Sequence, residues 1–151
     1  MFKLTNKVAL VTGARRGMGR AHALTLAAQG AKVAVTDVDL NDCQKVVEEI
    51  SATGGEARAY QLDVSAKDEV DKVFDQVVKD FGRLDILINN AGVYLPKLAM
   101  DLTEEDWDKT MAINLKGEFL CSQYIRKSSA EMGKSNSLCY HMRSSWPCKN
   151  G

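Results

Sequence analysis

Three closely spaced glycines carry the clearest chemical signal in the sequence. Gly13, Gly17 and Gly19 directly follow the apolar run 8–12, and a segment of helical composition comes after them. A phosphate approaches a backbone closely only where no Cβ intervenes, and the first N–H groups of a helix favour an anion. Strand, glycine turn and helix in this order predict a cradle for a nucleotide diphosphate. A tight turn that binds nothing is the alternative, because short glycine motifs also occur by chance.

Polar residues at the ends of later apolar runs support the first interpretation. Asp37 and Asp63 each follow such a run, and Asn-Asn-Ala-Gly at 89–92 follows another. The runs alternate with segments of helical pattern, which predicts parallel strands joined by right-handed crossovers. The carboxyl ends of parallel strands share one edge of a sheet, where doubly wound α/β proteins bind their ligands. We therefore expect the glycines and these polar residues to meet at one site.

The spacing of apolar residues predicts the elements that position this site. We expect strands over 8–12, 31–36, 57–62 and 84–88, the third at an edge of the sheet because it is less apolar. Helices are expected from Arg20 to Gln29, from a cap at Asp39 or Asn41 to about residue 52, and from a cap at Ser65 to Gly82. A further helix, capped by Thr103, is expected through Met111 and again from Asn114 to about residue 132.

Composition excludes several classes of function. The 151 residues suffice for one domain, and 20 Lys and Arg balance 20 Asp and Glu, so no net charge attracts nucleic acid or an anionic membrane. No stretch approaches the roughly 20 apolar residues of a membrane span, and the first strand begins too early for a signal peptide. Four cysteines without a C-x-x-C pair predict reduced thiols and a cytoplasmic location. The spacing of Cys139, His141 and Cys148 fits no standard metal site, so no metal is expected.

Taken in order, these motifs resemble the short-chain dehydrogenase/reductase family. The resemblance covers about residues 4–132 and rests on Thr12-Gly13-x-x-x-Gly17-x-Gly19, Asp37, Asp63-Val64, Asn89-Asn90-Ala91-Gly92 and Asn114. It implies an incomplete, doubly wound Rossmann sheet in three α/β/α layers over residues 1–133. Residues 134–151 depart from the family pattern, and we expect an irregular tail there with a short strand over 137–142.

The resemblance also implies a role for each matching residue. The glycine turn, with Met18 at the helix start, holds the cofactor pyrophosphate. Asp63 and Val64 contact the adenine, and the cofactor is lined further along by Asn90, Ala91 and Gly92. Asn89 stabilises the sheet itself. Asn114 corresponds to the active-site asparagine, which holds a water in a proton relay.

The cofactor preference depends on residues of opposite charge. Asp37 is placed to accept hydrogen bonds from the adenosine ribose hydroxyls, and its charge repels a 2′-phosphate, which favours NAD. Arg15 and Arg16 have the opposite effect, since arginine in this turn pairs well with that phosphate. We expect NAD, with NADP as the alternative.

The implied chemistry is hydride transfer between a nicotinamide and a small carbonyl or alcohol substrate. It needs a tyrosine acid/base whose pKa is lowered by a lysine four residues later. The sequence contains no Tyr-x-x-x-Lys. We therefore expect a partial chain that keeps the cofactor site and is catalytically incompetent.

Two other functions stay open. One is a non-catalytic dinucleotide-binding or interaction module. The other is an unstable truncated product, whose fourth strand has an unpaired outer edge unless the tail covers it. The resemblance implies homo-oligomers that pair through the helix near Asn114 and a later one. Only the first of these helices is present, so oligomerisation of this chain is not expected.

Overall fold

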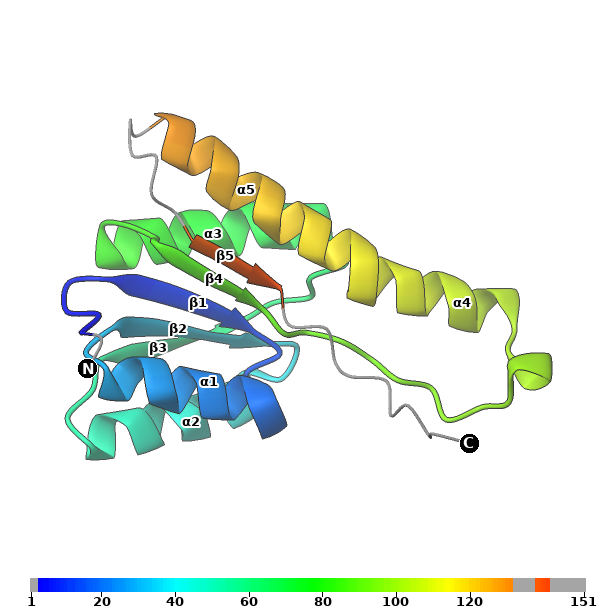
Figure 1. The fold of residues 1–151 in the computed structure, drawn as a ribbon, viewed down its shortest axis with the longest axis horizontal. Helices are drawn as coiled ribbons and strands as arrows, with labels where there is room; N and C mark the ends of the chain where they lie inside the picture. Colours follow the sequence, from blue (N-terminus) through cyan, green and yellow to red (C-terminus); the bar gives the residue numbers. More distant parts are fainter. Residues whose placement is uncertain (1–2, 132–137, 142–151) are drawn as a thin grey trace.

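The computed structural model describes residues 3–131 and 138–141, which form a parallel sheet with helices on both faces (Figure 1). The strands lie in the order β3-β2-β1-β4-β5, and each pairs in parallel with its neighbours. Their bounds are β1 Val8–Thr12, β2 Lys32–Asp37, β3 Ala57–Gln61, β4 Ile86–Asn89 and β5 Leu138–His141. This order confirms the predicted doubly wound α/β class and places β3 at an edge, as expected from its composition.

The helices occupy the predicted segments with shifted ends. Their bounds are α1 Gly17–Ala28, α2 Leu40–Ala52, α3 Lys67–Phe81, α4 Glu104–Met111 and α5 Gly117–Glu131. A short 3₁₀ turn, η1, covers Ala99–Asp101, and a π-helical segment, η2, covers Ala112–Lys116. The two helices expected around Asn114 are therefore one long rod, with the π-helical segment between α4 and α5 (Figure 1).

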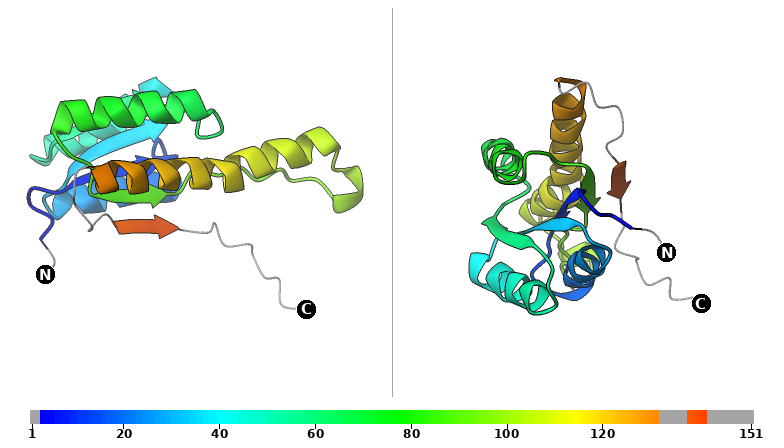
Figure 2. Two further views of the ribbon diagram at one scale, coloured as in Figure 1. Left: turned by 90° about the horizontal axis from the view of Figure 1, so that it is seen from above. Right: turned by 90° about the vertical axis from the view of Figure 1, so that its left-hand side faces the viewer.

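The sheet separates two apolar clusters. Helices α1 and α2 cover one face, and α3 and α5 cover the other (Figure 2). Side chains of β1 alternate between them, with Ala9 and Val11 in the first cluster and Val8 and Leu10 in the second. All five residues of β1 are buried, as expected for the central strand of a three-layer α/β/α domain.

Local side chains explain where the helices begin. Asp39 caps α2 by accepting the Asp42 N–H at 3.1 Å, and Thr103 and Asp106 form a reciprocal capping box at α4. The prediction that Ser65 caps α3 was wrong. Helix α3 begins at Lys67. The Ser65 hydroxyl donates instead to the carboxylate of Asp63, so this carboxylate stabilises the turn after β3.

Strand β5 lies in the segment expected to be an irregular tail. The predicted short strand is confirmed over Leu138–His141, where it pairs with β4 from Ile86 to Asn89, so irregular structure was the wrong expectation for these four residues. The outer edge of β4 is thus covered. The rest of the predicted tail lies outside the described residues. Within the described ranges, no helix combines the length and hydropathy that crossing a bilayer requires.

A buried carboxylate ties together the amino-terminal ends of β1 and β4. Asp85 accepts the Val8 N–H at 3.0 Å and the Arg83 Nε–H at 2.7 Å. Burial acts to raise the pKa of the Asp85 carboxyl, but the hydrogen bonds from Arg83 and Val8, together with the positive charges of Arg83 and Lys7, outweigh it and lower the pKa from its ordinary value.

Replacing this carboxylate is expected to lower stability in a pH-dependent way. Asp85→Asn removes a charged acceptor, which costs about 1–2 kcal/mol of the free energy of unfolding at neutral pH. Because the Asp85 pKa is lower in the folded state, its contribution is present above the unfolded pKa of about 3.9 and is lost as the pH falls through the folded pKa. Urea denaturation should therefore show the difference between wild type and variant shrinking in acid. A constant difference would contradict this, and Asp108→Asn, at an exposed position beyond the first turn of α4, is the control.

Candidate functional site

Hydrogen bonds join the turn after β1 to the turn after β4. The Thr12 Oγ1 atom accepts the N–H groups of Asn90 and Ala91, both at 3.0 Å. The Asn90 Nδ2 atom donates to the carbonyls of Thr12 and Gly13, also both at 3.0 Å. The two turns form one unit at the carboxyl edge, where the strand order changes direction beside β1. The Asn90 carboxamide is used within the protein, and its contact with a cofactor stays a prediction.

The three glycines serve different purposes. Gly13 has a φ of +64°, and a Cβ there would lie 2.7 Å from the Ala91 Cα. A Cβ on Gly19 would lie 2.2 Å from the Gly13 carbonyl oxygen and 2.5 Å from the Asn90 Nδ2. These two glycines therefore permit packing. Gly17 has a φ of +57°, but no atom lies within 4 Å of the position its Cβ would take. That position faces open space through which a ligand can approach the backbone.

The amino terminus of α1 opens onto the same space. Its N-cap residue, Arg16, makes no side-chain capping hydrogen bond, and the first turn contains no acidic residue. By contrast, α2 and α4 each have a capping side chain and an acid in the first turn, and α3 has Asp68 and Glu69 there. No acid of its own first turn therefore balances the positive end of the α1 dipole, which fits the binding of a phosphate.

Asp37 at the end of β2 is partnered by the glycine turn. Its carboxylate accepts the Arg15 N–H at 3.3 Å and the Val38 N–H at 2.8 Å. The Arg15 Nε lies 3.4 Å from the same carboxylate, and its Nη1 lies 3.9 Å from Asp42. Arg16 is exposed. The two arginines, which sequence reasoning treated together, are therefore not equivalent, because two carboxylates already hold Arg15.

The turn after β3 lies next to Asp37. The Leu62 N–H donates to the Asp37 carbonyl at 2.8 Å, which ties this turn to the end of β2. The Asp63 Oδ1 accepts the Ser65 N–H at 2.9 Å and the Ser65 hydroxyl at 2.7 Å. Val64 is buried. The predicted adenine contacts therefore share the carboxyl edge with Asp37, as the topology required.

Asn114 occupies the middle of the π-helical segment. Its Oδ1 accepts the Val93 N–H at 2.8 Å, and its Nδ2 donates to the Val93 carbonyl at 2.9 Å. Segments of π-helix are frequent at functional sites. Through its two hydrogen bonds to Val93, Asn114 holds the backbone that follows Asn90, Ala91 and Gly92. Its role in a proton relay stays a prediction. Asn89 is buried and donates to Ser122 of α5 at 3.0 Å, in keeping with a role in stabilising the sheet.

The Tyr60 phenol and the Cys43 thiol are poorly suited to acid/base or nucleophilic chemistry. Burial, and secondarily the hydrogen bond to Asp80, raises the pKa of the Tyr60 phenol, which moves it further from neutrality. Burial, with the nearby carboxylates of Asp37, Asp39 and Asp42, raises the pKa of the Cys43 thiol to about 12. Both groups therefore stay protonated near neutral pH.

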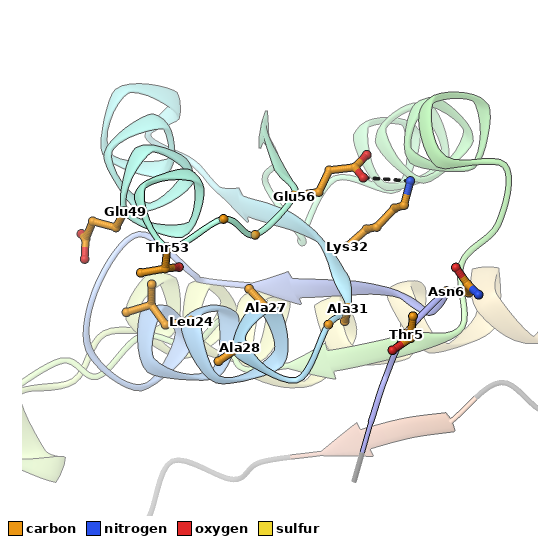
Figure 3. Close-up of a pocket in the computed structure, with 13 residues that line it drawn as sticks. Thr5, Asn6, Leu24, Ala27, Ala28, Ala31, Lys32, Glu49, Thr53 and Glu56 are labelled. Atoms are coloured by element: carbon orange, nitrogen blue, oxygen red, sulfur yellow. Dashed lines mark ion pairs between the residues drawn. The ribbon is translucent and has the colours of Figure 1, made fainter. Parts of the chain in front are cut away.

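A cavity of about 840 Å³ lies near the amino-terminal ends of the strands, at the other end of the sheet from the candidate site (Figure 3). It is bounded by the carboxyl ends of α1 and α2 and by the start of β2, and the Lys32–Glu56 ion pair of 2.8 Å lies on its rim. Ligands of doubly wound sheets bind at the carboxyl ends of the strands, so this cavity is not the dinucleotide site that the motifs predict.

Comparison with known proteins agrees with the motifs. Residues 7–136 match the family described as short chain dehydrogenase. A 3-oxoacyl-acyl-carrier-protein reductase of Staphylococcus epidermidis is 47% identical over 121 residues, which are 80% of this chain and 50% of that protein. The chain spans about half the length of the curated relatives it matches.

Solved structures have the same fold. A short-chain type dehydrogenase/reductase of Mycobacterium marinum superposes with a TM-score of 0.85 at 34% identity, over 87% of this chain and 53% of that one. A metagenomic short-chain oxidoreductase in complex with NADP superposes with a TM-score of 0.86, also at 34% identity, over 98% and 66%. The sheet described here is thus an incomplete version of a larger doubly wound sheet.

The different purposes of the glycines can be tested by matched substitutions. Gly19→Ala is expected to cost about 3 kcal/mol of the free energy of unfolding, because its methyl group would overlap the Gly13 carbonyl. Gly17→Asn is expected to cost less than about 0.5 kcal/mol, because asparagine adopts positive φ readily and the space is open. Urea denaturation measures both. Equal losses of stability would contradict the assignment.

Proposed function

Because the chain belongs to the short-chain dehydrogenase family, we propose that its carboxyl-edge site binds an adenine dinucleotide, NAD in preference to NADP. The observation that carries the proposal is the open, uncapped start of α1 beside Gly17. It provides backbone N–H groups and a positive dipole where a pyrophosphate needs them. Asp37 and the turn after β3 lie at the same carboxyl edge of the sheet as the start of α1. Their position supports the binding of an adenosine beyond the pyrophosphate.

We assign the cofactor contacts as follows. The turn from Gly13 to Gly19, with the backbone around Met18, holds the pyrophosphate, and Arg15 and Arg16 are the groups that would pair with the 2′-phosphate of NADP. Asp37 binds the adenosine ribose, Asp63 and Val64 bind the adenine, and Asn90, Ala91 and Gly92 border the cofactor beyond β4. When bound, the nicotinamide supplies or accepts a hydride. Asn114 fixes the backbone at Val93 and is placed to hold a water near the reacting groups.

For the whole protein we propose an NAD(P)-dependent oxidoreductase that acts on a small carbonyl or alcohol substrate. The chain contains no Tyr-x-x-x-Lys and spans about half the length of its curated relatives. The proposal is therefore that these 151 residues bind the cofactor without turnover. The balanced charge supports a small-molecule partner over nucleic acid or a membrane. The four cysteines form no C-x-x-C motif, which supports a cytoplasmic location.

A second candidate is a non-catalytic interaction module. Trp107, Leu115 and Phe119 recur at intervals of eight and four residues along the rod formed by α4, η2 and α5, and about three-fifths of each side chain is exposed (61%, 58% and 59%). Exposed apolar patches of this kind mark interaction surfaces. The pairing implied for family members uses this helix together with a later one that is not among these 151 residues, so the exposed patch supports an interaction surface without assigning its partner.

The cofactor preference gives the first test of the proposal. Isothermal titration calorimetry is expected to detect tighter binding of NAD than of NADP. Asp37→Ser should weaken NAD binding by about tenfold, because a charge-assisted hydrogen bond to the ribose is lost. The same change frees Arg15 from its nearer carboxylate, so the affinity for NADP should rise. Asp68→Asn is the control, and equal affinities of the Asp37→Ser variant and wild type would contradict the role of Asp37.

The absence of turnover is tested separately. With NADH and a panel of ketones, the rate of NADH oxidation by this chain is expected to equal the rate without protein, because no lysine stands four residues after a tyrosine. The measurement is the loss of NADH absorbance. Turnover that disappears in Asn114→Ala would overturn this prediction and favour the enzyme over the interaction module.

A further inference from the structure

We infer that Gly117 is a positioning residue that couples the adenine side of the site to Asn114 through its contact with Val64. The inference rests on the proposed dinucleotide function and deepens it. It explains how the turn after β3 and the π-helical segment are held in fixed positions relative to one another. Sequence reasoning singled out Val64 and Asn114 but not the glycine between them in space.

Gly117 is a glycine because of space rather than conformation. It is the first residue of α5, is buried, and has ordinary helical angles, φ −59° and ψ −46°. A glycine in such a position costs about 1 kcal/mol relative to alanine. A Cβ on Gly117 would lie 2.6 Å from the Val64 Cγ2, 3.0 Å from its Cβ and 3.2 Å from its carbonyl oxygen. The start of α5 therefore lies directly against both the side chain and the backbone of Val64.

One end of this contact is part of the predicted adenine site. Val64 lies between Asp63 and Ser65, which are joined by two hydrogen bonds to one carboxylate oxygen. The same turn is tied to Asp37 through the Leu62 N–H. Val64 cannot shift far without moving this turn, because Asp63 and Ser65 hold each other.

The other end of the contact is the segment that carries Asn114. Gly117 directly follows η2, and Asn114 lies in the middle of η2. The Asn114 carboxamide holds Val93 by two hydrogen bonds of 2.8 Å and 2.9 Å. The path from Asp63 to Val93 has three parts: the close approach of Val64 to Gly117, the helix backbone from Gly117 to Asn114, and the two hydrogen bonds from Asn114 to Val93. We therefore expect a displacement of Val64 on adenine binding to reach Asn114 and Val93.

The test follows amide signals of the 151-residue chain by NMR during titration with AMP, which carries the adenosine but no nicotinamide. In wild type, AMP is expected to shift the signals of the Ser65 N–H, the Val93 N–H and the Asn114 side-chain amide. Val64→Ala removes the Cγ2 facing Gly117 and also part of the proposed adenine contact, so this variant is titrated with AMP until the Ser65 shift saturates. At saturation, the Val93 and Asn114 shifts should be lost. Val73→Ala, the same deletion on α3 in the same apolar cluster, should keep all three shifts.

A second arm needs no ligand. Gly117→Ala is expected to displace the Val93 and Asn114 signals of the free protein, and Val64→Ala in the same chain should return them toward their wild-type positions. If AMP shifts no signal, the proposed dinucleotide function fails, and the ligand-free arm still decides the coupling. The coupling is overturned if AMP shifts Ser65 alone in wild type. It is also overturned if Val64→Ala keeps all three shifts, or if Gly117→Ala leaves Val93 and Asn114 unchanged.

Discussion

The Asn90 carboxamide holds the turns after β1 and β4 together by donating to the backbone carbonyls of Thr12 and Gly13. Strand pairing fixes β1 and β4 along their length but ends before these turns. Beyond it, the side chains of Asn90 and Thr12 supply the missing hydrogen bonds. Gly19 must lack a side chain for these hydrogen bonds to form, because its Cβ would overlap both the Asn90 amide and the Gly13 carbonyl. The start of α1, and with it the proposed phosphate cradle, depends on this arrangement.

Charge at the edge is distributed so that one helix end stays available. The acids near α2 and α4 are used to cap their own helices, and Asp37 is used to hold Arg15 and the backbone of the glycine turn. No acid is placed in the first turn of α1. The net charge of the chain is zero, so attraction of an anion to this edge depends on the local dipole and the exposed Arg16 rather than on the field of the whole protein.

The sequence predicted the features that depend on local pattern. Alternating apolar runs located β1 to β4, and the caps at Asp39 and Thr103 were correct because each bonds a backbone N–H three residues away. Ser65 was misassigned because a competing carboxylate two residues earlier takes its hydroxyl. The hydrogen bonds of Asn114 with Val93 and the contact of Gly117 with Val64 join residues that are distant in sequence and close only in the fold. No periodicity in one sequence reports such contacts.

A crystal structure of this chain with NAD tests most directly whether the four turns form one dinucleotide site. We expect the pyrophosphate over Gly17 at the start of α1, the adenosine ribose on Asp37 and the adenine beside Val64. NAD bound in the cavity near the amino-terminal ends of the strands, or with its pyrophosphate away from α1, would contradict this account.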